Sequence, residues 1–309
     1  MVKTALVTGC AGFIASHLTD KLLEKGFTVI GIDNLSTGIM ENLPTSANFE
    51  FHKLDITEDL SPVIEQDLDY VFHLAAISSV KLSVEDPLLV NKHNTIGTLN
   101  VLNLAKERDA RRFVFSSSAA VYGNPDTQPI TESMPIDCLS PYAASKASAE
   151  KYIQAYIKTY SLESTLLRYF NVYGPRQAYS AYSGVVSIFI NDALQEKPLT
   201  IDGDGTQTRS MIHVNDVVDA TIRAAEVADI SGEIINICGT EVLTILEIAK
   251  KIADNFESVQ IIHGPPRAGD VKESFGSLKK AKKLLDFEPT IPFETGLEET
   301  IKWYRERFG

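Results

Sequence analysis

The stretch VTGCAGFIA at residues 7–15 decides the fold. It connects a short apolar run at residues 4–7 to residues 13–24, in which apolar side chains recur every three or four positions. A buried strand, a glycine turn and an amphipathic helix in this order are typical of the first unit of a dinucleotide-binding α/β sheet. Gly9 and Gly12 would let the backbone approach a pyrophosphate, and the helix would offer it free N–H groups. Alone, the glycine run is a weak signal, because ordinary turns also use glycine.

A carboxylate strengthens this interpretation. Asp33 ends the next predicted strand, residues 28–32, and follows Gly12 by about 20 residues, the spacing of the acidic residue that binds the ribose of NAD. There it would accept hydrogen bonds from both ribose hydroxyls and repel the extra phosphate of NADP. Residues 34–38 contain no Arg or Lys that would offset this repulsion. The sequence therefore predicts NAD as the cofactor, with a simple turn cap as the alternative role of Asp33.

The same alternation of strand and helix continues through the first half of the chain. Further buried strands are predicted at residues 70–73 and 112–116, and helices at residues 87–107 and 141–160. This order indicates a doubly wound parallel α/β sheet. After Arg168 the pattern changes to shorter mixed elements, with loop-like residues at 171–183, a break at 264–266 and a final helix at 296–307.

Composition excludes several classes of protein. The 29 basic and 41 acidic residues give a formal net charge of −12, which argues against a nucleic-acid surface but not against a small anionic ligand. Three distant cysteines and six histidines without ligand spacing predict no metal site and no disulfide framework. No apolar run approaches the ~18 residues of a membrane span, and the first strand leaves no room for a signal peptide. We expect a cytoplasmic protein without a membrane or nucleic-acid partner.

A tyrosine and a lysine carry the catalytic signal. Tyr142 and Lys146 lie four positions apart at the start of the helix predicted at 141–160, and so face the same side. To act as a base, tyrosine needs its pKa lowered from about 10 towards about 7, roughly 4 kcal/mol, which Lys146 and a positive nicotinamide ring together would supply. Ser118 follows the strand at 112–116, and its hydroxyl would hold a substrate oxygen. The alternative is an exposed Tyr–Lys pair, worth about 0.3 kcal/mol to a helix.

Together with later motifs, these features resemble the extended short-chain dehydrogenase/reductase family. The later motifs look like those of UDP-sugar 4-epimerases, and the resemblance covers essentially the whole chain. It rests on HLAA at 73–76, SSSAAVYG at 116–123, RYFNVYGPR at 168–176, GDGTQTR at 203–209 and RAGD at 267–270. The resemblance implies an NAD-binding Rossmann domain in residues 1–170, with a later contribution from about 212–237, and a smaller mixed α/β domain in 171–309 that mainly binds a UDP-sugar.

The resemblance also implies a set of cofactor-binding residues. Asp55 and Ile56 would contact the adenine, Leu74, Ala75 and Ala76 would pass beneath the cofactor, and the buried Asn94 would support the active site. The other implied cofactor contacts are Gly9, Gly12, Phe13, Ile14, Asp33, Asn34, Ser36, Thr37, Gly38, Tyr142 and Lys146. Ala15 departs from the family pattern, because it stands where the third glycine is usual.

For the substrate, the resemblance implies that Asn171 binds the diphosphate, that Arg209 and Arg267 clamp it, and that Asp270 holds the uridine ribose. A planar guanidinium fork suits phosphate oxygens. Ser274 would wall the sugar pocket beside carbon 2, and the remaining implied contacts are Ser79, Ser118 and Val185. Ser210 departs from the pattern, because an Asp usually follows the clamping Arg.

The reaction that the resemblance implies is NAD-dependent 4-epimerisation of a UDP-hexose through a 4-keto intermediate. UDP-glucose and UDP-galactose are the expected pair, and the small Ser274 would leave room for their N-acetylated forms. Sugar 4,6-dehydration is disfavoured, because Ser118-Ala119 stands where dehydratases carry Asp-Glu. UDP-glucuronate 4-epimerisation, another nucleotide-sugar oxidoreduction and a non-catalytic NAD-binding regulator remain as alternatives.

The helices at 87–107 and 141–160 carry more apolar residues than a sheet needs for cover. They include Leu88, Leu89, Ile153 and Ile157. Relatives in the family pair these two helices across a two-fold axis. The resemblance therefore implies a homodimer.

Overall fold

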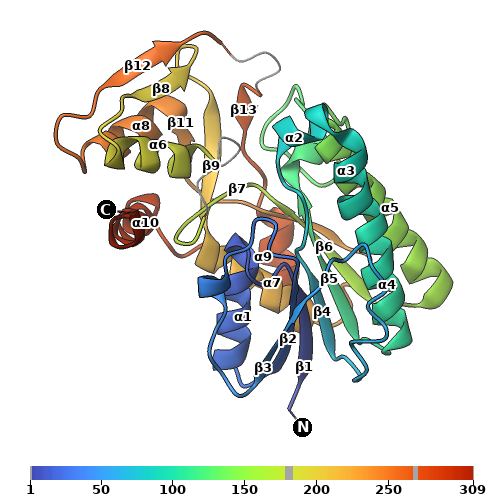
Figure 1. Cartoon of the computed structure of the whole chain (residues 1–309). Coiled ribbons are helices and arrows are strands. Elements are labelled where there is room, and N and C mark those ends of the chain that lie inside the picture. Colours follow the sequence, from blue (N-terminus) through green and yellow to red (C-terminus); the bar gives the residue numbers. More distant parts are fainter. Residues whose placement is uncertain (1, 178–183, 267–270, 309) are drawn as a thin grey trace.

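A seven-stranded parallel sheet forms the centre of the computed structural model, which describes residues 2–177, 184–266 and 271–308. The strand order is β10-β6-β5-β4-β1-β2-β3, and it reverses between β1 and β4 (Figure 1). In doubly wound sheets ligands bind at the carboxyl ends of the strands beside this reversal. The strands are β1 (Thr4–Thr8), β2 (Thr28–Asp33), β3 (Phe49–Lys53), β4 (Tyr70–His73), β5 (Arg112–Ser118), β6 (Ser164–Tyr169) and β10 (Ile234–Ile237). The predicted doubly wound fold is confirmed.

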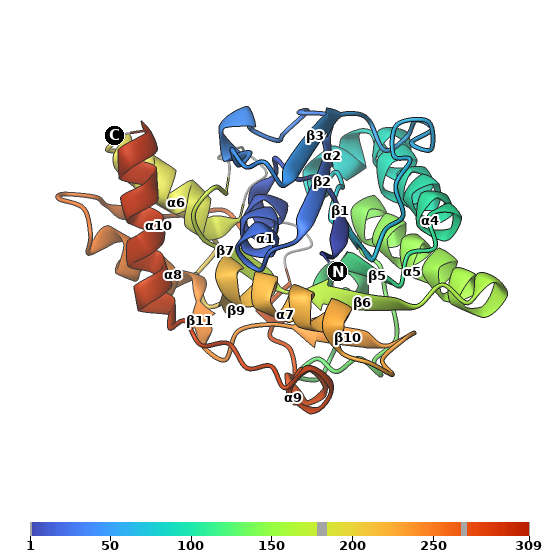
Figure 2. The same cartoon turned by 90° about the horizontal axis from the view of Figure 1, so that it is seen from below.

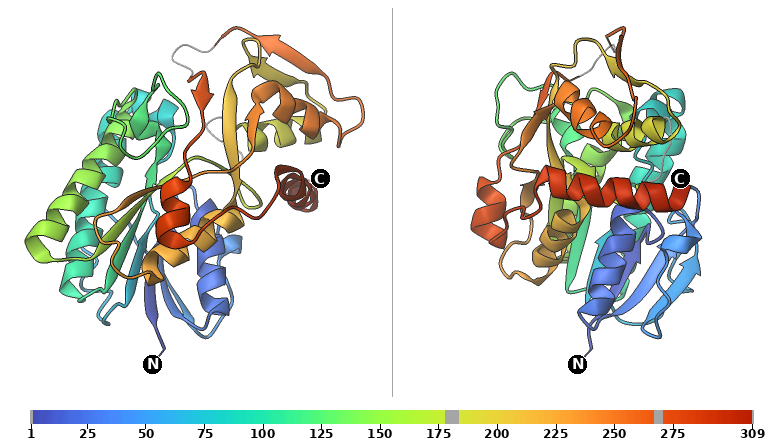
Figure 3. Two further views of the ribbon diagram at one scale, coloured as in Figure 1. Left: turned by 180° about the vertical axis from the view of Figure 1, so that it is seen from behind. Right: turned by 90° about the vertical axis from the view of Figure 1, so that its left-hand side faces the viewer.

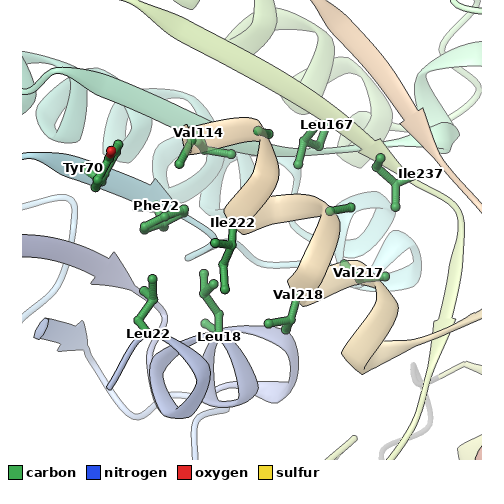
Figure 4. Close-up of a cluster of buried hydrophobic side chains, with 14 of the residues drawn as sticks. Leu18, Leu22, Tyr70, Phe72, Val114, Leu167, Val217, Val218, Ile222 and Ile237 are labelled. Carbon is green, nitrogen blue, oxygen red and sulfur yellow. The ribbon is translucent and has the colours of Figure 1, made fainter. Parts of the chain in front are cut away.

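Helices cover both faces of this sheet (Figure 2). On one face, α4 (Thr98–Glu107) and α5 (Pro141–Tyr160) bury Leu102 and Ile153 against strand residues such as Phe113. On the other face lie α1 (Phe13–Glu24) and α7 (Val214–Glu226), which are about 200 residues apart in the chain. Leu18 and Leu22 of α1 meet Val218 and Ile222 of α7 there, over Phe72 and Val114 (Figure 4).

The carboxyl-terminal part forms a smaller unit of short strands and helices. Its main sheet has the order β11-β9-β13, with β7 also paired to β9, and β8 pairs separately with β12. The C-terminal helix α10, red in Figure 3, lies beside this unit and packs against its α6 and β9. The elements are β7 (Asn171–Tyr173), α6 (Val185–Leu194), β8 (Leu199–Asp202), β9 (Thr208–His213), β11 (Val242–Thr244), α8 (Ile245–Ala253), β12 (Ile261–Gly264), β13 (Glu273–Ser274) and α10 (Phe293–Phe308). Helix α9 (Lys279–Leu285) instead packs against α7 and β10 of the large sheet.

Three expectations from the sequence need correction. The single helix expected at 87–107 is interrupted: α3 (Pro87–Asn91) leads into a π-helical turn at Lys92–Gly97 before α4 begins, and α2 (Val80–Glu85) precedes it. Residues 171–173, expected in a loop, form β7 because they pair with β9. The final helix begins at Phe293, before the expected residue 296.

Short 3-10 turns occur at Met40–Asn42 and Ala119–Tyr122.

No helix within residues 2–177, 184–266 and 271–308 combines the length and the apolar character that crossing a bilayer requires.

Candidate active site

The glycine turn lies between β1 and α1, at the carboxyl edge of the sheet. Gly9 has a φ of +76°, and a Cβ there would lie 3.0 Å from the backbone of Ala75, so only glycine allows this close approach. Gly12 is the N-cap residue of α1 and has an extended conformation. Because it has no side chain, no capping group occupies the N–H groups at the start of the helix. The first turn of α1 contains no acidic residue that would repel a phosphate. This geometry fits a dinucleotide pyrophosphate, with Phe13 and Ile14 in the first turn beside it.

Asp33 stands at the end of β2 and faces the same turn. Its Oδ2 accepts a hydrogen bond from the Ala11 N–H at 3.0 Å, and its Oδ1 accepts one from the Leu35 N–H at 2.7 Å. Burial raises the pKa of Asp33, and these two hydrogen bonds oppose that rise. A Cβ at Gly38 would lie 2.7 Å from the Asp33 carboxylate, so this glycine gives the carboxylate its space. Asp33 therefore caps a turn, as its alternative role expected, and its contact with a ribose stays a prediction.

Asp55, after β3, joins two loops at the predicted adenine side. The Asn34 amide donates to its Oδ2 at 2.9 Å, and the Thr57 N–H donates to its Oδ1 at 2.8 Å. His93 Nε2 lies 3.3 Å from Oδ2. Burial opposes the charge, but the hydrogen bonds and His93 outweigh it and lower the pKa of Asp55 to about 2. Ile56 beside it is buried, whereas Ser36 and Thr37 are exposed on the loop after β2.

Thr8 and His73 fix the loop that is predicted to pass beneath the cofactor. The Thr8 hydroxyl accepts hydrogen bonds from the N–H groups of Leu74 and Ala75 at 3.2 and 3.1 Å, while Ala76 follows in the same loop. It also bonds to Nδ1 of His73 at 2.8 Å, and Nε2 of His73 bonds to Thr98 at 2.9 Å. Burial, and then the charge of Lys146, lower the pKa of His73 to about 3. The imidazole is therefore neutral.

These hydrogen bonds were not predicted from the sequence. The available signals were the polar Thr8 and His73, each at the carboxyl end of a strand after apolar residues.

Asn94 connects this region to α5. It lies in the π-helical turn, where its Oδ1 accepts from the Ile77 N–H at 2.8 Å. Its Nδ2 donates to the Ile77 carbonyl and to the Ser145 hydroxyl, both at 3.0 Å. Ser145 in turn donates to the Tyr142 carbonyl at 2.7 Å. A π-helical turn is common at functional sites, and here it brings the Asn94 amide between the two segments.

Tyr142 and Lys146 both lie buried in the first turns of α5. The helix begins sharply because the Ser140 hydroxyl caps the Ala143 N–H and Pro141 occupies the first turn. Lys146 Nζ donates to the Ser116 carbonyl at 2.7 Å and lies 4.8 Å from the centre of the Phe115 ring. The structure thus anchors the pair at the end of β5, so the alternative of an exposed Tyr–Lys pair is wrong.

The electrostatics of the pair differ from the expectation in one respect. Burial raises the pKa of Tyr142, although a hydrogen bond with Ser118 opposes the rise. Burial lowers the pKa of Lys146 to about 7, against the opposing charge of Glu150. The lysine alone therefore does not bring the tyrosine pKa towards neutrality. The positive nicotinamide ring of a bound NAD would supply the missing positive charge beside it.

Three of the predicted substrate residues, Asn171, Arg209 and Ser274, lie on β9 or on strands paired with it. Asn171 of β7 donates from its amide to the Ser210 carbonyl at 3.3 Å, and Arg209 donates to the Val271 carbonyl at 2.8 Å. Ser274 of β13 is the register partner of Arg209. Val185 starts α6, and Ser79 caps α2, where its hydroxyl accepts from the Leu82 N–H at 2.9 Å. Arg267 and Asp270 lie outside the described residues.

The chain is similar to known proteins over nearly its whole length. A family profile described as "NAD dependent epimerase/dehydratase family" matches residues 5–238. A putative UDP-glucose 4-epimerase of Methanocaldococcus jannaschii is 39% identical over 304 residues, which cover 97% of this chain and 98% of that protein. A UDP-glucuronate 4-epimerase of Thermodesulfobacterium geofontis is 35% identical over 97% of this chain and 96% of that protein.

Solved structures agree over nearly the full length. The UDP-N-acetylglucosamine 4-epimerase of Methanobrevibacter ruminantium, in complex with UDP-N-acetylmuramic acid, superposes with a TM-score of 0.94 at 38% identity and covers 99% of both chains. The UDP-glucose 4-epimerase of Thermus thermophilus, in complex with NAD, gives a TM-score of 0.89 at 34% identity over 98% of this chain and 99% of that chain. The resemblance stated from the sequence and the predicted NAD dependence are confirmed. The chain belongs to the NAD-dependent epimerase/dehydratase family.

Proposed function

We propose that this protein is a UDP-sugar 4-epimerase that interconverts UDP-glucose and UDP-galactose and accepts their N-acetylated forms. The observation that carries the proposal is the buried Tyr142–Lys146 pair, anchored to the end of β5. The glycine turn and Asp33 lie at the same edge of the same sheet. The glycine turn and Asp33 would hold NAD, which would supply the hydride acceptor for carbon 4 of the sugar and the hydride donor for its return.

Each residue of the catalytic group has a distinct part in this reaction. The Tyr142 phenolate takes the proton of the sugar 4-hydroxyl, and the phenol that results later gives it back. Lys146, held by the Ser116 carbonyl, provides the positive charge that favours the phenolate. Ser118 presents a hydroxyl at the end of β5, where it holds the reacting oxygen of the sugar.

The substrate side suits a UDP-sugar. Arg209 and Arg267 are the proposed diphosphate clamp, Asn171 a further diphosphate contact and Asp270 the ribose contact. Support comes from the register of β7, β9 and β13, which gathers Asn171, Arg209 and Ser274. Tight binding of the nucleotide, with few charges near the sugar, would let the keto sugar rotate between the two hydride transfers and present its opposite face.

Incubation of the purified protein with UDP-glucose, UDP-galactose, UDP-N-acetylglucosamine and UDP-glucuronate, each followed by separation of the epimers, tests this proposal. We expect the two hexoses and the N-acetylated sugar to reach equilibrium with their 4-epimers. Turnover of UDP-glucuronate alone would reassign the substrate, as the similarity to a UDP-glucuronate 4-epimerase allows. Net consumption of added NADH would indicate a one-way reductase, and turnover of none of the four would contradict the proposal.

We also propose a cytoplasmic homodimer. Val84 and Leu88 are 66% and 80% exposed on α2 and α3, and Ile96 beyond them is 44% exposed. Apolar side chains this exposed on neighbouring elements are typical of a subunit interface. One expected contact is wrong, because Ile153 is buried in the core of its own subunit. Light scattering at micromolar concentration tests the assembly, and a monomeric mass would refute it.

The proposed cytoplasmic location is supported by the cysteines. Cys10, Cys138 and Cys238 are all free, as is usual in a reducing compartment.

A further inference from the structure

A buried ion pair joins Glu150 to Arg168 close to the proposed catalytic residues. Glu150 is on α5, one helical turn beyond Lys146, and is 1% exposed, while Arg168 of β6 is 2% exposed. The Glu150 carboxylate accepts from Arg168 Nε at 2.8 Å and from Nη2 at 2.6 Å, which is a two-pronged contact. The Ser117 hydroxyl donates to the same carboxylate at 2.6 Å.

Stability alone does not account for this pair. Removing two charges from water costs about as much as their attraction returns, and apolar side chains of similar size often serve a core equally well. What the pair does provide is fixed geometry, because a planar guanidinium and a carboxylate allow one relative orientation.

That geometry acts on the catalytic group. Lys146 donates to the Ser116 carbonyl, and Glu150 accepts from the Ser117 hydroxyl, so α5 is hydrogen-bonded to two successive residues of β5. The next residue is Ser118. Arg168 holds the same point of α5 to β6, which leads directly into Asn171.

We propose that Glu150 is a positioning residue of the reaction: through Arg168 and Ser117 it fixes α5 to the ends of β5 and β6, and its negative charge favours the ammonium form of Lys146. This rests on the proposed epimerase function, in which Lys146 acts as a cation. The groups facing Lys146 are Tyr142 and Glu150 on its own helix, the neutral His73 on β4, the Phe115 ring and Ser116 carbonyl on β5, and Arg168 on β6 beyond Glu150.

The two parts of the proposal separate in two variants. Glu150→Gln keeps the shape of the side chain but removes its negative charge, so the positive charge of Arg168 is no longer neutralised. Both effects favour loss of the proton from Lys146. The high-pH limb of the kcat profile should then move to lower pH by about one unit. Glu150→Asp keeps the charge but shortens the side chain, so kcat should fall about tenfold while the high-pH limb of its profile stays at the wild-type pH. In both variants KM for the UDP-sugar should stay near the wild-type value.

The chain offers a matched control at the opposite edge of the same strands. Arg112 at the start of β5 pairs with Glu163 just before β6, with Nη2 and Oε2 2.8 Å apart. The Glu163 side chain is 57% exposed. Glu163→Gln removes an Arg–Glu pair far from Lys146 and should leave kcat and its pH profile unchanged.

A second measurement needs no turnover and so separates this proposal from the epimerase function. Phenolate absorbance of the NAD-loaded protein is titrated against pH, with Tyr142→Phe subtracted. Glu150→Gln should raise the midpoint of Tyr142, because a neutral Lys146 no longer favours the phenolate. A wild-type midpoint and pH profile in Glu150→Gln would overturn the proposal, as would a loss of kcat that matches the loss of folded protein.

Discussion

The cofactor half and the substrate half of the site are built in different ways. In the cofactor half, Asp33, Asp55 and Asn94 each make at least two hydrogen bonds to neighbouring loops at the ends of long parallel strands. In the substrate half, Asn171 and Ser274 lie on strands of three and two residues that depend on β9 for their pairing. We infer that the many hydrogen bonds of the cofactor half fix the positions of its side chains. The short strands of the substrate half impose fewer restraints, so substitution of a few side chains there could alter which sugar is accepted.

The most severe way to break the cofactor half is Tyr142→Phe. Loss of the proton-transferring hydroxyl should lower kcat by at least about 10², while bound NAD, measured as nicotinamide absorbance after borohydride treatment, stays near wild type. Lys146→Ala should lower kcat and weaken NAD as well. Tyr156→Phe on the same helix, where the hydroxyl bonds Asn103 at 2.7 Å, is the control. Near-normal activity of Tyr142→Phe would remove the tyrosine from its assigned role.

Ser274→Tyr tests whether the substrate half alone decides the sugar. A tyrosine would fill the space beside carbon 2, so turnover of the N-acetylated sugars should be lost, at a cost of up to about 3 kcal/mol for forcing the acetamido group in. Turnover of UDP-glucose should be spared. Ser274→Ala is the control and should keep both activities. If the tyrosine variant keeps both, Ser274 does not wall the pocket.

The pH dependence of the free energy of unfolding tests whether His73, in the cofactor half, is buried in its neutral form. Burial lowers the pKa of His73 to about 3, so the unfolded chain binds a proton below about pH 6.5 that the folded chain does not. His73 therefore contributes stability that is complete above this pH and is lost as the pH falls. At pH 5 the loss is about 2 kcal/mol.

Chemical denaturation between pH 7 and 5 measures this loss. His73→Gln should be less stable at pH 7 but show a flatter dependence, and the exposed His263→Gln is the control. Equal slopes for wild type and His73→Gln would show that His73 is not kept neutral by the fold.

Asp33→Asn sharpens the comparison with the smallest effect. The amide keeps the shape but removes the charge, so NAD should bind about tenfold more weakly and the discrimination against NADP should shrink. Binding of the two cofactors to cofactor-stripped protein measures both changes. Asp59→Asn, on an exposed loop, should alter neither, and a wild-type preference for NADP would show that Asp33 has another role.

The same contrast explains what the sequence could predict. The predicted bounds of α1, β4 and α5 agree with the structure, because apolar periodicity and the cap formed by Ser140 and Pro141 are local signals. The π-helical turn could not be predicted, since it depends on Asn94 reaching Ile77 from another segment. The short strands β7 and β13 exist through pairing with β9, which no local pattern encodes.

Arg168 shows the limit for single residues. A charge within the apolar run TLLRY marks something unusual, but the identity of its partner on α5 depends on the packing of helix against sheet.

The late position of α7 in the chain sets an order on biosynthesis. Leu167, Val114 and Phe72 lie under α7 on one face of the sheet (Figure 4), yet α7 ends at Glu226. A nascent chain emerging from the ribosome therefore carries an uncovered apolar face on β4, β5 and β6 until these later residues follow. This is the interval in which we expect a chaperone to be needed, and a stop codon placed before Val214 should yield an aggregating fragment rather than a smaller cofactor-binding protein.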